Sequence, residues 1–254
     1  MTTETDTMAL ADYLAQGGKL TSPENVPPRY RAELMRLMSS FVDSALAGSA
    51  GFADAINKAP GIKERIAASR ITLEKADHAE RVLALMAEFG TDVSRYNAAH
   101  DWAARVGRDE DIGARRHGGD MRLSVFHYPL QGWADAVTMN VLMGTASVIH
   151  LEEMALASYS PLAEVLRELL PRERRHLELG LEGLERLVGT ARGAVGAALA
   201  YWDPKVSQTF GPETSERYDR LRAMGLRHHP NADLRQRWQS AVESHLQGLG
   251  LGAP

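Results

Sequence analysis

Apolar residues recur every three or four positions along most of the chain, which is the period of an amphipathic α-helix. One such stripe contains Leu162, Leu166, Leu169, Gly180, Leu184 and Leu187. No segment shows the strict alternation of apolar and polar residues that is typical of a half-buried β-strand. The pattern therefore predicts an all-α fold.

Proline and glycine divide the pattern into predicted helices. Long helices are expected at about 28–48, 61–90 and 130–158 and from Pro161 onward, and Pro204 is expected to end a further helical stretch. Shorter helices are expected at about 92–106, 213–224 and 231–246, with Asp92 and Asn231 as N-caps. Four long helices separated by short breaks predict an up-and-down four-helix bundle with additional short peripheral helices. We expect one domain over 20–247, flanked by flexible segments at 1–19 and 248–254.

Composition narrows the class of protein. The 254 residues carry a formal net charge of −4, which gives no basic signature for nucleic acid, and there is no cysteine for a disulfide or a thiolate metal site. No apolar run reaches the roughly 18 residues that span a bilayer. The polar, acidic start of the chain does not resemble a signal peptide. We therefore expect a cytoplasmic protein that binds neither nucleic acid nor membranes.

Glu173 and His176 lie one helical turn apart, on the apolar stripe described above. Burial of an unpaired polar group costs roughly 2–7 kcal/mol, so a carboxylate and an imidazole on a core-facing stripe need partners. Helical bundles that hold two metal ions use this E-x-x-H pair as a ligand unit. The alternative is an intrahelical contact on a partly exposed face, because three arginines surround the pair.

A second pair of polar residues lies in the helix predicted at 61–90. Lys75 and His78 are three positions apart and share the inward face with apolar residues, whereas Glu74 and Asp77 lie at its flanks and are expected in solvent. Taken alone, His78 is most simply a hydrogen-bonded core histidine.

A carboxylate-bridged di-metal centre needs about four carboxylates and two histidines from four helices. The helices predicted at 28–48 and 130–158 offer no obvious inward carboxylate: Asp43 falls off the apolar stripe, and Glu152 and Glu153 fall near a helix end. By spacing alone, the metal site is incomplete.

From about Leu20 to Leu251 the chain resembles the A subunit of the bacterial multicomponent phenylacetyl-CoA epoxidase, a family of ferritin-like di-iron monooxygenases. The segments that carry the resemblance are Pro28-x-Tyr30-Arg31, Phe126-x-Tyr128-Pro129-x-x-x-Trp133-Ala134-Asp135, Ser158-Tyr159-x-Pro161, Phe210-Gly211-Pro212 and Asp233-Leu234-Arg235-Gln236-Arg237. Their order and spacing together make the resemblance fairly specific. It implies a ferritin-like bundle and, in active members, two irons.

The resemblance also implies which positions correspond to metal ligands. The family's two E-x-x-H motifs fall on Lys75 with His78 and on Glu173 with His176, and the remaining two carboxylates fall on Ala45 and Gly144. Three ligand positions, His78, Glu173 and His176, are thus retained. The other three, Ala45, Lys75 and Gly144, are substituted, although the helix periods place all three on inward faces.

These substitutions lead to a specific hypothesis. We predict a Lys75–Glu173 ion pair where relatives hold metals, no cofactor in this chain, and iron only if the site is active after all. The first functional interpretation is a metal-free scaffold, partner subunit or divergent paralogue in a phenylacetyl-CoA oxygenase system, assembled as a homo-oligomer or with another ferritin-like subunit. The alternatives are an active monooxygenase in which Glu74, Asp77 or Glu153 replaces the lost ligands, and a non-catalytic protein that binds an aromatic acyl-CoA.

Overall fold

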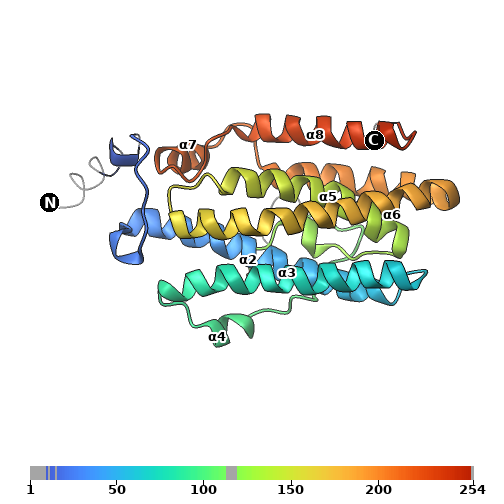
Figure 1. The fold of residues 1–254 in the computed structure, drawn as a ribbon, viewed down its shortest axis with the longest axis horizontal. Helices are drawn as coiled ribbons and strands as arrows, with labels where there is room; N and C mark the ends of the chain where they lie inside the picture. The colour runs from blue at the N-terminus through green and yellow to red at the C-terminus, as the bar shows by residue number, and fades with distance from the viewer. Residues whose placement is uncertain (1–9, 11, 15, 113–118, 253–254) are drawn as a thin grey trace.

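The computed structural model describes residues 10, 12–14, 16–112 and 119–252. Over these residues the secondary structure is helical apart from one isolated bridge between Leu20 and Tyr159, so the prediction of an all-α fold is confirmed. Four long helices lie side by side: α2 (Pro28–Ile56), α3 (Ile62–Glu88), α5 (Trp133–Met154) and α6 (Ser160–Ser207) (Figure 1). The helices pack as two hairpins, α2 on α3 and α5 on α6. The predicted four-helix bundle is therefore present.

The connection between α3 and α5 is long rather than short. It returns along the bundle and brings Leu130 next to the end of α2, where the carbonyl of Leu130 accepts a hydrogen bond from Lys58 at 2.9 Å. As a result, α3 and α5 run in the same direction (Figure 1). The crossover contains α4 (Val93–Asn97) and a 3-10 turn, η2 (Ser124–His127).

Asp92 caps α4 as predicted, since its carboxylate accepts a hydrogen bond from the backbone N–H of Arg95 at 3.0 Å. The helix nevertheless ends at Asn97, not near Val106. Arginine side chains bind the carbonyls of Asp101, Trp102 and Ala104, which a continuing helix would have used internally. The prediction of a longer helix was wrong for this reason.

Three further boundaries differ from the prediction. Helix α2 continues through Gly48 to Ile56, so this glycine does not end the helix. It instead leaves room for the side chain of Lys75, which would lie 3.2 Å from a Cβ at this position. Helix α6 continues through Pro204 to Ser207 and is interrupted only at Ala191, whose backbone is non-helical. Asn231 is the first residue of α8 (Asn231–Gly248) rather than its N-cap, and its side chain bonds Pro212 and Arg227.

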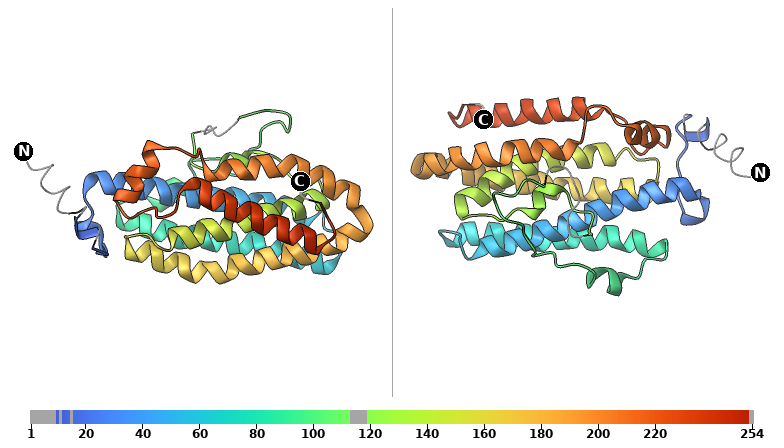
Figure 2. Two further views of the ribbon diagram at one scale, coloured as in Figure 1. Left: turned by 90° about the horizontal axis from the view of Figure 1, so that it is seen from above. Right: turned by 180° about the vertical axis from the view of Figure 1, so that it is seen from behind.

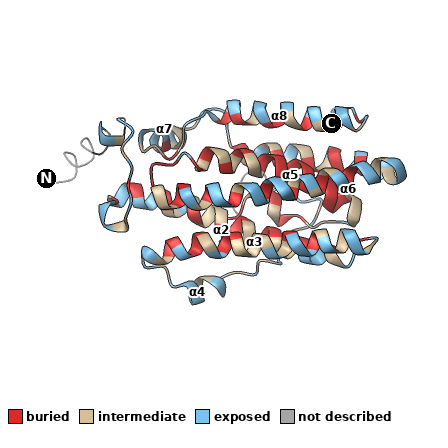
Figure 3. Ribbon diagram, viewed as in Figure 1, coloured by how far each residue is buried: buried red, intermediate tan, exposed pale blue. Residues whose placement is uncertain are grey.

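Two apolar clusters fill the bundle. One joins α2, α3 and the start of α6, and the other joins α5, the second half of α6 and α8. Helices α7 (Glu216–Ala223) and α8 lie outside α5 and α6 (Figure 2), and the inward faces of the long helices are buried (Figure 3). Within the described part of the chain, no helix is both long and apolar enough to cross a bilayer.

The ends of the chain lie partly outside the described residues, and their flexibility remains a prediction. Leu20 is buried and exchanges backbone hydrogen bonds with Ser158 and Ser160. Leu251, within the predicted tail, is also buried, and its N–H bonds the carbonyl of Leu246. The packed part of the domain therefore reaches at least from Leu20 to Leu251.

Candidate functional site

A cavity of about 180 Å³ lies inside the bundle, where the two apolar clusters meet. Its walls come from α2, α3, α5, α6 and η2. Much of the apolar wall is formed by Leu37, Phe41, Phe126, Met143, Leu151 and Met154. One end carries Lys75, His78 and Glu173, and other polar residues from α5 and the region after α6 line it elsewhere. The cavity is therefore an apolar chamber with charged groups in its wall.

Glu173 is the centre of the first charged group. Its carboxylate oxygens lie 3.1 and 3.2 Å from Lys75 Nζ, and Oε1 is also 3.0 Å from His78 Nδ1 and 3.5 Å from His176 Nδ1. The side chains of Glu173 and Lys75 are only 5% and 12% exposed. The predicted Lys75–Glu173 ion pair is thus present, with both histidine rings beside it.

The charges of this group are fixed by its surroundings. Burial alone would raise the pKa of Glu173, but the Lys75 ammonium and the two imidazoles hold that pKa well below its usual range. Burial lowers the pKa of His78, so its ring is neutral at neutral pH and donates from Nδ1 to the carboxylate. His78 Nε2 is then an acceptor with no partner in the described structure.

Glu74 joins the same group, although the sequence predicted that it would lie in solvent. Its Oε2 is 2.8 Å from His176 Nε2, and its side chain is only 26% exposed. A carboxylate accepts hydrogen bonds, so His176 donates from Nε2 and its Nδ1 side faces Glu173. Asp77 does lie at the flank as predicted, paired with Arg172 at the surface. The sequence analysis placed Glu74 wrongly because it did not anticipate that α6 covers the flank of α3 next to Lys75.

The two other substituted positions differ from each other. Ala45 lines the cavity beside Lys75, in agreement with the inward face that the helix period predicted. Gly144 is buried but does not line the cavity, because it lies at the contact between α5 and α6: a Cβ there would be 3.6 Å from Leu177. Met143 and Ser147 face the cavity instead. Neither Ala45 nor Gly144 supplies a donor atom.

Comparison with known proteins bears on this arrangement. The model of the family described as phenylacetic acid catabolic protein matches residues 8–254. The chain belongs to this family. It is also 24% identical over 251 residues to the A subunit of 1,2-phenylacetyl-CoA epoxidase from Escherichia coli (strain K12), covering 95% of this chain and 75% of that protein. The predicted resemblance is confirmed, and the bundle is the ferritin-like fold of the phenylacetic acid catabolic proteins.

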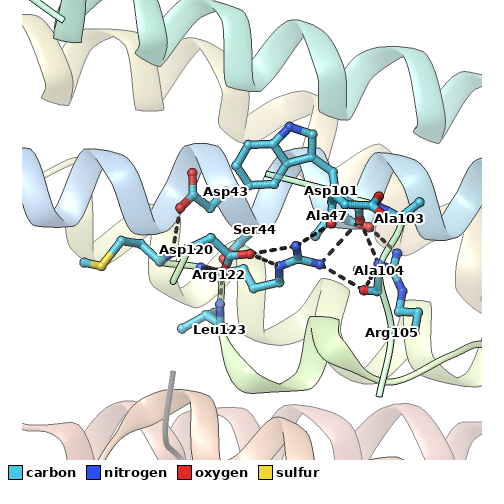
Figure 4. Close-up of polar contacts among 12 residues, drawn as sticks. Asp43, Ser44, Ala47, Asp101, Ala103, Ala104, Arg105, Asp120, Arg122 and Leu123 are labelled. Carbon is cyan, nitrogen blue, oxygen red and sulfur yellow. Dashed lines mark hydrogen bonds and ion pairs between the residues drawn. The ribbon is translucent and has the colours of Figure 1, made fainter. Parts of the chain in front are cut away.

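Among the other buried carboxylates are Asp43 and Glu153, which the sequence placed off the apolar stripe and near a helix end, respectively. Asp43 on α2 is 2% exposed, but it faces the crossover, where it accepts a hydrogen bond from Tyr96 at 2.5 Å. It also accepts one from the N–H of Met121 at 2.6 Å (Figure 4). Both partners are distant in sequence. Asp43 is therefore committed to holding the crossover on α2.

Glu153, in contrast to Asp43, lines the cavity. It is 2% exposed and binds the N–H groups of His228 and His229, the His229 ring and Arg227 at 2.6–3.3 Å. Burial would raise its pKa, but these donors lower it, so Glu153 is ionised at neutral pH. Glu152, its neighbour, pairs instead with Arg174 and Arg237 at the surface. Glu153 thus anchors the α7–α8 connection to the cavity wall.

His150 gives the stability of this fold a pH dependence. Burial, reinforced by the charge of Arg227, lowers its pKa to about 4. Above pH ~6.5 the ring is neutral in both the folded and the unfolded chain, and the stability is fully present. As the pH falls towards 4, only the unfolded chain takes up the proton, so the free energy of unfolding decreases.

We expect His150→Asn to remove this contribution of the ring to the loss of stability between pH 7 and pH 4. The contribution is roughly 2–3 kcal/mol, a value reduced to allow for the partial exposure of the ring to solvent. Urea unfolding at pH 7 and pH 4 measures it, and equal losses in both proteins would contradict the assignment.

Proposed function

We propose that this chain is a metal-free, non-catalytic homologue of the epoxidase A subunit, which serves as a partner protein in an aromatic acyl-CoA oxygenase system. The observation that carries the proposal is the ammonium of Lys75, 3.1 Å from the Glu173 carboxylate. It provides the positive charge that metal ions would otherwise supply to Glu173, His78 and His176. The family membership supports the choice of pathway and the expectation of partner subunits.

The donor set does not fit two irons. A divalent ion about 4 Å from an ammonium is repelled by roughly 8 kcal/mol at an effective dielectric constant of about 20. Two such ions bring four positive charges, and among the described residues the carboxylates in contact with this group are Glu173 and Glu74. The substituted positions Ala45 and Gly144 contribute no oxygen or nitrogen ligands.

The candidates for substitute ligands are occupied elsewhere. Glu74 meets His176 at Nε2, on the opposite side of the ring from Glu173, so the two carboxylates do not face one point. Asp77 is paired with Arg172, and Glu153 is saturated by donors from the α7–α8 connection. These contacts weigh against an active monooxygenase.

Binding of an aromatic acyl-CoA without turnover is a second candidate function, favoured by the cavity itself. A cavity of about 150 Å³ in another protein is known to hold benzene, and this one measures about 180 Å³ with a largely apolar lining. Such a chamber can accept a phenyl ring while the polar part of the ligand remains outside. This function is compatible with the role of a partner subunit.

One experiment separates these functions. The protein is incubated with ferrous iron, a reductant, oxygen and phenylacetyl-CoA, and products are analysed by mass spectrometry, while calorimetry measures binding of the same thioester. We expect no oxygenated product, and release of an epoxide or hydroxylated thioester would overturn the proposal. Measurable binding would support the second candidate. In that case Ala45→Leu, which narrows the cavity, should weaken binding, whereas Ala53→Leu on the exposed face of α2 should not.

A further inference from the structure

The outward face of α3 carries an unusual line of apolar side chains. Ile62, Ile66 and Leu73 are 70%, 55% and 71% exposed, and they are three of the six large hydrophobic residues exposed in the described structure. Their spacing places them on one face of the helix, which the exposed Ala84 continues. Single exposed hydrophobic residues are normal, but an aligned set marks an interaction surface. We call this surface the α3 face; helix α3 lies along one edge of the bundle (Figure 1).

The charges beside the α3 face are separated by sign. Lys63 and Arg70 lie in the first half of the helix, and Glu80 and Glu88 in the second. All four are exposed, and none has an ion-pair partner among the described residues. Their neighbours Asp77 and Arg81, in contrast, are paired with α6. The four charges are therefore available to a partner whose charges run in the opposite order.

A second copy of α3 in antiparallel orientation has that order. The pairs Arg70 with Glu80, Lys63 with Glu88, and Ile66 with Ala84 are all centred at or next to Lys75 along the helix. A twofold axis near this position would bring every pair together at once, as the self-complementary interface of a symmetric dimer requires. Parallel docking would instead place like charges opposite each other.

We propose that the α3 face is an interface at which a second copy of this chain docks in antiparallel orientation. Leu73 lies nearest the twofold axis, Ile66 of one copy meets Ala84 of the other, and Ile62 lies towards the end of the interface. Arg70 and Lys63 of one copy meet Glu80 and Glu88 of the other. The proposal does not depend on the metal content or on the ligand of the cavity, because the α3 face lies on the outside of the bundle.

Sedimentation velocity over a range of protein concentrations tests the apolar part. We expect a dimer, and we expect Leu73→Glu to raise its dissociation constant at least tenfold. Leu73 is so exposed that this change leaves the fold intact. Leu156→Glu is the matched control, since Leu156 is 43% exposed in the turn that follows α5. A monomer at all concentrations, or a dimer that is equally sensitive to both changes or to neither, would overturn the proposal.

Charge exchange tests the orientation. Arg70→Glu and Glu80→Arg alone each place like charges across the twofold axis, so each should weaken the dimer. The double variant restores opposite charges at both symmetry-related contacts and should recover the affinity of the unaltered protein. A double variant as weak as the single ones would exclude the antiparallel arrangement. Association only with a different protein would also overturn the proposal.

Discussion

Replacing Lys75 by glutamate is expected to lower the free energy of unfolding by about 3–5 kcal/mol, because the change removes one partner of a buried ion pair. The new carboxylate would lie next to Glu173, which is 3% exposed and whose other close polar side chains, within the described part of the chain, are His78 and His176. Urea unfolding followed by circular dichroism in metal-free buffer measures the effect. The same charge change at the exposed residue Arg29 should stay within about 0.5 kcal/mol.

Two further measurements on this pair sharpen the result. Lys75→Met combined with Glu173→Gln should recover most of the stability, since neutral replacements for a buried ion pair are often tolerated. Lys75→Glu also restores an E-x-x-H motif on α3, so it should bind more ferrous iron than the unaltered protein. If Lys75→Glu is as stable as Arg29→Glu, the ion pair does not have the structural role assigned to it.

Replacing Arg122 by methionine is expected to cost a similar amount, about 3–5 kcal/mol. Arg122 and Asp120 are 3% and 4% exposed, and their side chains bond each other at 2.8 Å (Figure 4). The same guanidinium binds the carbonyls of Asp101, Trp102 and Ala104. Without it, a carboxylate and several carbonyls of the crossover would be left without their partner.

Arg105→Met provides the control for this second change. Arg105 also binds carbonyls, those of Ala47, Trp102 and Ala104, but it has no carboxylate partner among the described residues. We therefore expect a smaller loss, about 1–3 kcal/mol. Thermal or urea unfolding compares the two variants, and Arg122→Met with Asp120→Asn should recover part of the loss. A greater loss for Arg105→Met than for Arg122→Met would show that the carboxylate is not the main cause.

The sequence was sufficient to predict features that depend on residues close together along the chain. The helical period predicted the four long helices, and it also placed Lys75 inward, because this residue shares a face with His78 and the apolar residues of α3. Opposite charges on two facing helices then predicted the pair with Glu173. The helix steps use residues within a few turns of one another, whereas the pair, which joins residues 98 positions apart, also needed the ligand positions that the family resemblance implied.

The sequence was insufficient where the partner comes from a distant segment. Glu74 lies at the flank of its helix and meets His176 only because α6 covers that flank. Asp43 is buried by Tyr96 and Met121 of the crossover, whose path no periodicity predicts. Gly144 is turned towards α6 rather than the cavity, and a difference of this kind depends on the rotation of α5 within the bundle. The inward face of a helix can thus be predicted from the sequence more readily than the distant segments that pack against that helix.

The iron content of the protein after anaerobic reconstitution with excess ferrous iron tests the central claim most directly. After removal of unbound metal, elemental analysis should give well below one iron per chain, because the Lys75 ammonium already supplies positive charge to Glu173, which both histidines also contact. A content close to two irons per chain would contradict the account.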